Sequence, residues 1–344
     1  MKRIRITHID GALPNLALMS ISAWMKAQGH EVHFKRTPSR ELGEPEYDEV
    51  YASAIFSKSA PLVEELKRWW PDAIVGGTWT DQRGDSGEDL NPKVTSIVPS
   101  QFTALDYDIY PEFTASLGFT QRGCRFRCSF CRVPGLEGRP NSFSPIHSIW
   151  RGPGHPKHLH LLDNDAFSSP EWRDRIAEIR DGDFKVCFSQ GLNIRIISHE
   201  QAAVLATIKY RDNAFKRSRL YTAWDNLGDE RVFFRGVDRL EEHGIPPHHL
   251  MTYSLVGYFP DETWEGIWHR HHRMVERGIK PYVMIHEDAK MRPEGGSLPS
   301  WNELKALQRW VNMGLYRTVK DFSDYRVSHK TARHGIDERQ IALI

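Results

Sequence analysis

The chain has 344 residues, of which 40% are hydrophobic, and its 46 basic and 45 acidic residues give a formal net charge of +1. This length and apolar content suit two domains, or one barrel with an added module, and argue against wholesale disorder. The balanced charge provides no overall attraction to nucleic acid, which would need a local basic patch. No stretch approaches the roughly 20 apolar residues of a membrane span. The N-terminus also lacks the apolar run of a signal peptide, so we expect no membrane partner and a cytoplasmic location.

Strands and helices alternate over the first 95 residues. The predicted strands cover residues 3–10, 30–34, 48–56 and 73–77, and the predicted helices cover residues 15–29 and 59–71. In the first strand, a period of two would place Ile4, Ile6 and His8 on one face. Short connections between alternating elements predict a small open sheet of parallel strands that is covered by helices.

Residues 96–115 have little periodic signal, and we predict that they form a linker. Six apolar strands are then predicted at residues 116–123, 158–163, 184–191, 219–225, 249–257 and 280–286. Helices are predicted between them at residues 170–180, 198–209, 230–244 and 262–278. Six such units predict a partial (β/α)6 TIM-type barrel over residues 116–290. We expect the tail, residues 291–344, to contain one helix at 300–314 and then a basic segment.

Three of the four cysteines lie close together, at Cys124, Cys128 and Cys131, on the loop that leaves the first barrel strand. Clustered cysteines in a chain without a secretion signal indicate a metal site rather than disulfides. Three thiolates can hold three irons of a 4Fe–4S cluster and leave the fourth iron open to a small molecule, unlike four-thiolate ferredoxins. The alternative is a zinc-stabilised, non-enzymatic nucleic-acid-binding module, although the paired ligand clusters of zinc fingers are absent. The fourth cysteine, Cys187, is predicted to be a buried core residue, or else a hydrogen-atom donor facing the barrel interior.

Residues 122–131 read RGCRFRCSFC, with an aromatic residue before the last cysteine. This segment resembles the signature of the radical S-adenosylmethionine superfamily, especially members with an N-terminal cobalamin-binding domain and methylthiotransferases. Five further segments are similar in order and spacing to segments of that group: residues 13–34, 48–56, 73–80, 161–167 and 254–263. The resemblance covers most of residues 1–290. It implies an α/β fold in which residues 1–95 form a flavodoxin-like (Rossmann-like), degenerate cobalamin-binding domain that precedes a radical S-adenosylmethionine barrel.

The resemblance implies an enzyme that reductively cleaves S-adenosylmethionine at a 4Fe–4S cluster. The resulting 5′-deoxyadenosyl radical would act on an unidentified substrate, in a methyl transfer or another C–H functionalisation, with electrons from a donor such as flavodoxin or ferredoxin. The metal ligands would be Cys124, Cys128 and Cys131. The candidate residues for binding S-adenosylmethionine are Asp163, Asn164, Asp165, Gln190, Asn193, Arg195, Asp225 and Gly257. Alternatively, Asp163 or Asp165 caps the following helix, and Arg195 forms an ordinary surface salt bridge.

Two features depart from the family pattern. Cobalamin domains with a histidine ligand carry Asp-x-His-x-x-Gly after the first strand, whereas here His8 precedes Asp10. Cobalamin held through histidine is therefore not expected, and binding without that ligand stays open. Only Cys187 is left for a second cluster, which disfavours sulfur insertion. The histidines of residues 269–272 are predicted to lie on a solvated helix face, because adjacent helical positions do not share one face.

Overall fold

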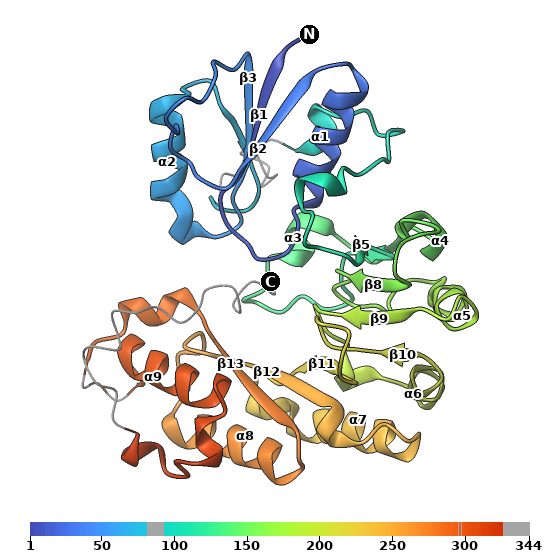
Figure 1. The fold of residues 1–344 in the computed structure, drawn as a ribbon. Coiled ribbons are helices and arrows are strands. Elements are labelled where there is room, and N and C mark those ends of the chain that lie inside the picture. The colour runs from blue at the N-terminus through green and yellow to red at the C-terminus, as the bar shows by residue number, and fades with distance from the viewer. Residues whose placement is uncertain (81–92, 295, 297, 326–344) are drawn as a thin grey trace. The chain divides into compact units, whose positions relative to one another are not determined.

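The computed structural model describes residues 1–80, 93–294, 296 and 298–325, which fall into two compact units (Figure 1). Unit 1 comprises Met1–Thr114, and unit 2 begins at Ala115. Both units combine parallel sheets with helices, which confirms the predicted α/β class. No helix within the described ranges is long and apolar enough to cross a membrane.

Unit 1 contains a four-stranded parallel sheet in the order β2-β1-β3-β4. Its elements are β1 (Arg3–His8), α1 (Leu16–Ala27), β2 (Glu31–Lys35), β3 (Glu49–Ser53), α2 (Ala60–Trp69) and β4 (Ile74–Gly76). Ile4 and Ile6 of β1 pack with Leu18 of α1, whereas Val50 of β3 packs with Leu66 of α2. The two helices therefore cover opposite faces of the sheet, as Figure 1 shows.

The α2 face of β1 carries a buried charge. The side chain of Arg5 is fully buried, and its Nε donates to Glu44 Oε1 at 2.9 Å. The same guanidinium donates to the carbonyl oxygens of Thr37 and Ser39 at 3.0 and 3.1 Å, and it lies 4.2 Å from the ring centroid of Trp70. Because an unpaired buried charge is costly, these contacts fix the long connection between β2 and β3.

The segment predicted as a linker, residues 96–115, instead packs on α1 through residue 113. The ring of Phe102 meets that of Trp24 edge-on, with centroids 5.1 Å apart. The amide of Asp106 donates to the carbonyl oxygen of Met19 at 3.1 Å. Irregular backbone can bury apolar side chains in this way, because the absence of periodicity signals only the absence of regular secondary structure.

Unit 2 contains two parallel sheets, in the orders β10-β9-β8-β5 and β11-β12-β13, and one short antiparallel hairpin. The six predicted strands are present as β5 (Ser116–Gly118), β8 (His158–Leu161), β9 (Lys185–Phe188), β11 (Leu220–Ala223), β12 (Leu250–Val256) and β13 (Lys280–Ile285). The predicted helices are α5 (Trp172–Asp181), α6 (His199–Ala206), α7 (Glu230–Glu242) and α8 (Trp264–Glu276). Elements not predicted are β6 (Gln121–Arg122), α3 (Val133–Glu137), β7 (Asn141–Ser142), α4 (Ile146–Ile149) and β10 (Lys209–Tyr210). The amide of Leu192 donates to the carbonyl oxygen of Tyr221 at 2.7 Å, so the two sheets adjoin.

The helix predicted at residues 300–314 is present as α9 (Trp301–Asn312), which begins with a capping box between Ser300 and Glu303. Leu304 and Leu307 of α9 share an apolar core with Val283 of β13. The tail was predicted as a separate region from residue 291, but its described part packs as one layer of unit 2. The basic segment was predicted to follow this helix, and its part from residue 326 onward lies outside the described residues.

Helix α8 is buried on two sides, so the predicted solvated face is wrong in part. Arg270 and His271 are only 3% and 5% exposed, whereas His269 and His272 are exposed. The ring of His271 lies 5.2 Å from that of Trp310 in α9. The added helix α9 covers a surface of α8 that a barrel alone would leave in water.

We expect unit 1 to lose stability in mild acid through His8. Burial and the nearby charge of Arg36 lower the pKa of His8 to about 4, although Asp10 opposes the shift. Because the folded state binds fewer protons than the unfolded state, this stability is complete above pH 6.5 and disappears as the pH falls toward 4. Between pH 7 and pH 5 the loss should be roughly 2 kcal/mol. Urea unfolding of the wild type and of His8→Gln, followed by tryptophan fluorescence, should give curves that converge on acidification. Parallel curves would contradict this prediction.

Candidate metal centre

The three clustered cysteines lie on a loop that a hairpin closes. Strands β6 and β7 pair antiparallel, with Arg122 opposite Asn141, and they enclose residues 123–140. Gly123 begins the loop with a φ of +82°, and a Cβ atom there would lie 2.5 Å from the carbonyl oxygen of Arg139. Only glycine combines that backbone conformation with so close an approach, so the tight entry to the cysteine loop depends on it.

Glu137, at the end of α3, ties this loop together. Its Oε2 accepts hydrogen bonds from the amide of Gly123 at 2.8 Å and from Asn164 Nδ2 at 2.9 Å. Its Oε1 forms an ion pair with Arg122 at 2.8 Å. One carboxylate therefore connects the start of the loop, its final helix and the turn after β8.

Asp163, predicted to meet the cofactor, instead binds the backbone that leaves β5. Its Oδ1 accepts from the amides of Thr120 at 2.7 Å and Gln121 at 3.2 Å, and its Oδ2 accepts from the hydroxyl of Thr120. Burial raises the pKa of Asp163 to about 6, although these three donors favour the carboxylate. Both oxygens are thus engaged within the protein, and a role in binding the cofactor stays a prediction.

Asp165 and Asn164 are likewise directed at the cysteine loop. Asp165 forms a two-point ion pair with Arg125, with Nε and one terminal nitrogen 2.6 and 2.8 Å from its oxygens. Such forked pairs restrict geometry more than a single contact does. Asn164 donates to Glu137. The acidic turn after β8 therefore holds the loop on both sides of Cys124.

Arg195 extends from the turn after β9 to the same loop. One terminal nitrogen donates to Asp229 Oδ2 at 2.9 Å, and the other lies 3.9 Å from Cys128 Sγ. Its guanidinium also stacks 4.3 Å from the ring centroid of Phe126, and its Nε donates to Asn193 Oδ1 at 3.4 Å. The structure thus brings together Arg195, Asn193 and the cysteine loop, and the alternative of an ordinary surface salt bridge describes only part of the contacts.

Asp225 follows β11 and accepts the amide of Leu255 at its Oδ1, at 2.9 Å. Burial raises its pKa. The adjacent backbone is held by Arg270, whose terminal nitrogen donates to the carbonyl oxygens of Asp225 and Leu255 at 2.8 and 3.0 Å. A second terminal nitrogen of Arg270 pairs with Glu262 at 3.0 Å. This buried pair aligns the carboxyl ends of β11 and β12.

The two remaining candidates lie at strand ends. Gln190 follows β9 and is partly exposed. Gly257 follows β12 with a φ of +86°, and a Cβ there would come within 2.7 Å of the Ala289 side chain. Packing therefore explains this glycine without a ligand. The neighbouring Tyr258 lies with its ring 5.6 Å from that of Phe130, which connects this turn to the cysteine loop.

Sequence reasoning missed four residues that shape this site. Glu137 and Arg270 carry no motif, because their role is to join segments that are far apart in sequence. Glu262 joins separate segments in the same way, because its Oε2 accepts a hydrogen bond from the amide of Gly257 at 2.5 Å. Gln121 is fully buried, and neither polar atom of its amide has a partner within the described ranges. A buried amide without protein partners needs a water, an ion or a ligand atom to satisfy it.

The donor chemistry of the loop fits an iron–sulfur cluster, although the sulfurs are not gathered into a finished cage. Among the described residues, no group of three or more His, Cys, Asp or Glu side chains is arranged to hold a metal ion. All three thiols are partly exposed on one irregular loop. Burial raises the pKa of Cys124 and of Cys131, so both remain protonated until a metal displaces the proton. Three thiols and the orphaned amide of Gln121 suit a three-thiolate cluster with a polar ligand beside it.

Cys187 of β9 is fully buried, as predicted, and its Sγ donates to Asn213 Oδ1 at 3.0 Å. Its neighbours Val186 and Phe188 belong to the apolar core beneath the helices, so the thiol lies on the other face of the sheet. It is therefore separate from the loop of the other three cysteines along β9, and a role as hydrogen-atom donor stays a prediction.

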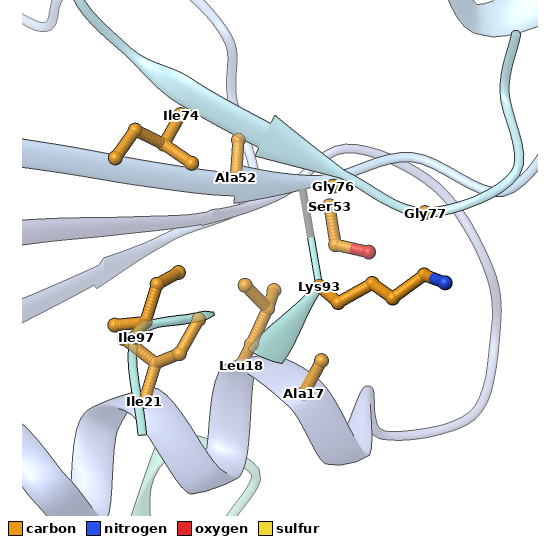
Figure 2. A pocket seen from close by; sticks show the side chains of 10 residues that line it. All are labelled: Ala17, Leu18, Ile21, Ala52, Ser53, Ile74, Gly76, Gly77, Lys93 and Ile97. Carbon is orange, nitrogen blue, oxygen red and sulfur yellow. The ribbon is translucent and has the colours of Figure 1, made fainter. Parts of the chain in front are cut away.

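Among the described residues of unit 1, neither the cavity beside α1 nor His8 suits cobalamin. A cavity of ≈ 40 Å³ opens between α1 and the carboxyl ends of β3 and β4, with Lys93 at its rim (Figure 2). Pockets for ligands of drug size occupy roughly 300–1,000 Å³, so this one suits a few water molecules. His8 is 2% exposed, and its Nδ1 lies 3.1 Å from the hydroxyl of Tyr110, so it is not positioned as a ligand to cobalt.

Comparison with protein-family models finds no match for this chain, and comparison with curated proteins finds none either. The assignment of a function consequently depends on the residues of the cysteine loop and on the contacts that hold it.

We expect Glu137→Gln to loosen the cysteine loop without unfolding unit 2. Glutamine keeps the shape of the side chain but loses the ion pair to Arg122. It also leaves one oxygen instead of two to accept hydrogen bonds. Limited proteolysis with trypsin should cut at the exposed Arg127 several-fold faster than in the wild type. The control is Glu171→Gln, which removes an exposed partner of Arg175 in α5 and leaves the ion pair of Glu137 intact. Equal cleavage rates in both variants would show that Glu137 does not restrain the loop.

Proposed function

We propose that this protein is a radical S-adenosylmethionine enzyme. The observation that carries the proposal is a loop with Cys124, Cys128 and Cys131 at the carboxyl edge of a parallel α/β sheet, held there by Glu137 of the loop's own helix and by Asp165 of the turn after β8. Active sites of β/α folds form at that edge. The proposal includes a partial (β/α)6 barrel in unit 2 and a flavodoxin-like domain in unit 1.

In this proposal the three thiolates would hold a 4Fe–4S cluster, which supplies the electron that cleaves S-adenosylmethionine. Phe126 and Phe130 flank Cys128 in the loop and would shield the sulfurs from water. Arg195 brings a positive charge within 3.9 Å of one sulfur, that of Cys128. Glu137 and the Asp165–Arg125 pair restrain the loop against movement.

The same geometry divides the predicted cofactor residues into two groups. Asp163 uses its carboxylate on the backbone that leads into the loop, and Asp165 uses its own on Arg125 of the loop, so both act as positioning residues. Asn164 Oδ1, Asp225 Oδ2 and the amide of Gln190 accept or donate no hydrogen bond within the described part of the chain. Together with the buried amide of Gln121, these atoms are the candidates for orienting the polar groups of S-adenosylmethionine.

An electron donor such as flavodoxin or ferredoxin, in the cytoplasm, completes the proposal. Cobalamin is left out because, among the described residues of unit 1, His8 is not positioned as a cobalt ligand and the cavity beside α1 is too small. The zinc-binding alternative remains the competing hypothesis, and the metal content distinguishes the two.

The first test is anaerobic reconstitution of the full chain with iron and sulfide. We expect about four irons per chain, and 5′-deoxyadenosine by mass spectrometry after addition of dithionite and S-adenosylmethionine. Cys128→Ala should abolish the product because the cluster loses a ligand. Cys187→Ala is the matched control, since it removes the one cysteine outside the loop and should leave the iron content unchanged.

Two outcomes would reject the proposal. One is a colourless protein that binds zinc with the same three cysteines and never accepts a cluster. The other is a stable cluster that does not cleave S-adenosylmethionine under reducing conditions.

A further inference from the structure

The opposite edge of unit 2, where β11 and β13 begin, carries cations instead of cysteines. Arg219 directly precedes β11, and Lys280 is the first residue of β13. Strand β12 lies between them, and all three strands are parallel (Figure 1). Both side chains are partly buried.

The strand register places these cations on one face of the sheet. Met251 of β12 is the register partner of both Tyr221 and Lys280, so the three side chains point the same way. Arg219 lies two residues before Tyr221 and shares its face. One terminal nitrogen of Arg219 donates to the carbonyl oxygens of His248 and Leu250 at 3.0 and 3.1 Å. Its guanidinium therefore reaches over the start of β12, toward Lys280.

None of these cations is neutralised by the described residues. No ion pair joins Arg219, Lys280 or the nearby Arg217 and Arg317 to a carboxylate in residues 1–80, 93–294, 296 or 298–325. The amides of Arg217 and of Lys216 both donate to Asp212 Oδ1, so the nearest carboxylate is engaged with backbone.

The pKa values of Lys280 and Arg219 are both lowered, which shows that their charged forms are destabilised in this arrangement. Burial lowers the pKa of Lys280, and the charges of Arg219, Arg317 and Arg217 lower it further. Burial likewise lowers the pKa of Arg219, with Arg217 and Arg317 adding to the shift and Asp212 opposing it. Four like charges with guanidinium and ammonium donors left unused are stabilised when an anion joins them.

We propose that Arg219 and Lys280 form a binding site for a phosphate group, either free or carried by a monoester. A dianion bridges two cations across one strand, and a guanidinium presents paired donors to phosphate oxygens. Three tyrosine rings line the same face farther along the strands. Tyr221 and Tyr253 stack with centroids 6.0 Å apart, and Tyr282 meets Tyr253 at 5.7 Å. Tyr221 and Tyr253 are buried, at 4% and 8% exposed, so of the three only the partly exposed Tyr282 offers its ring to an aromatic group on the ester.

The test is calorimetric titration of the full chain with inorganic phosphate and with phenyl phosphate at constant ionic strength. The test variant combines Arg219→Gln with Lys280→Gln, and we expect it to bind at least about tenfold more weakly because two charge-assisted contacts are lost. The control combines Arg173→Gln with Lys209→Gln. It removes the same charge from exposed ion pairs with Glu200 and Asp183.

Tighter binding of phenyl phosphate than of phosphate would identify a monoester as the ligand, and equal binding would identify free phosphate. The single variant Arg317→Gln changes an exposed side chain and should weaken binding about threefold, which keeps the test valid if the double variant misfolds. The proposal is overturned if neither ligand binds, or if test and control variants bind equally.

Discussion

Parallel strands leave backbone amides without a ladder partner where they end, and in this chain an aspartate of the neighbouring strand satisfies them in three places. Each of these aspartates lies two residues past the end of its own strand. They are Asp10, which binds the amides of Ile55 and Phe56, Asp163, which binds those of Thr120 and Gln121, and Asp225, which binds that of Leu255. This use of an aspartate occurs in both units, so it is a feature of the α/β architecture and is not specific to a functional site.

This constraint changes how acidic residues at strand ends are interpreted. A carboxylate in that position resembles a ligand residue in the sequence, because active sites of these folds also form at the carboxyl edge. Asp163 shows why the two roles compete, since both of its oxygens are used by the segment that leads into the cysteine loop. The frame that orients the loop and the groups that would contact a cofactor are therefore different residues of the same turn.

Charge is distributed unequally between the two edges of unit 2. At the carboxyl edge, Arg122, Arg125 and Arg195 each face a carboxylate. At the amino edge, Arg219 and Lys280 have no such partner within the described ranges. A chain with a net charge of +1 thus contains a local excess that its composition conceals.

The sequence by itself determined the alternation of strands and helices, the six main strands of unit 2 and the grouping of three cysteines, because these depend on periodicity and spacing along the chain. It also carried the resemblance on which the proposed chemistry depends. Only the tertiary structure showed that residues 97–113 pack on α1, that Arg270 is buried, and that Glu137 joins three segments. Those facts depend on contacts between residues far apart in sequence. A local sequence pattern does not specify which distant carbonyl or carboxylate group a side chain will contact.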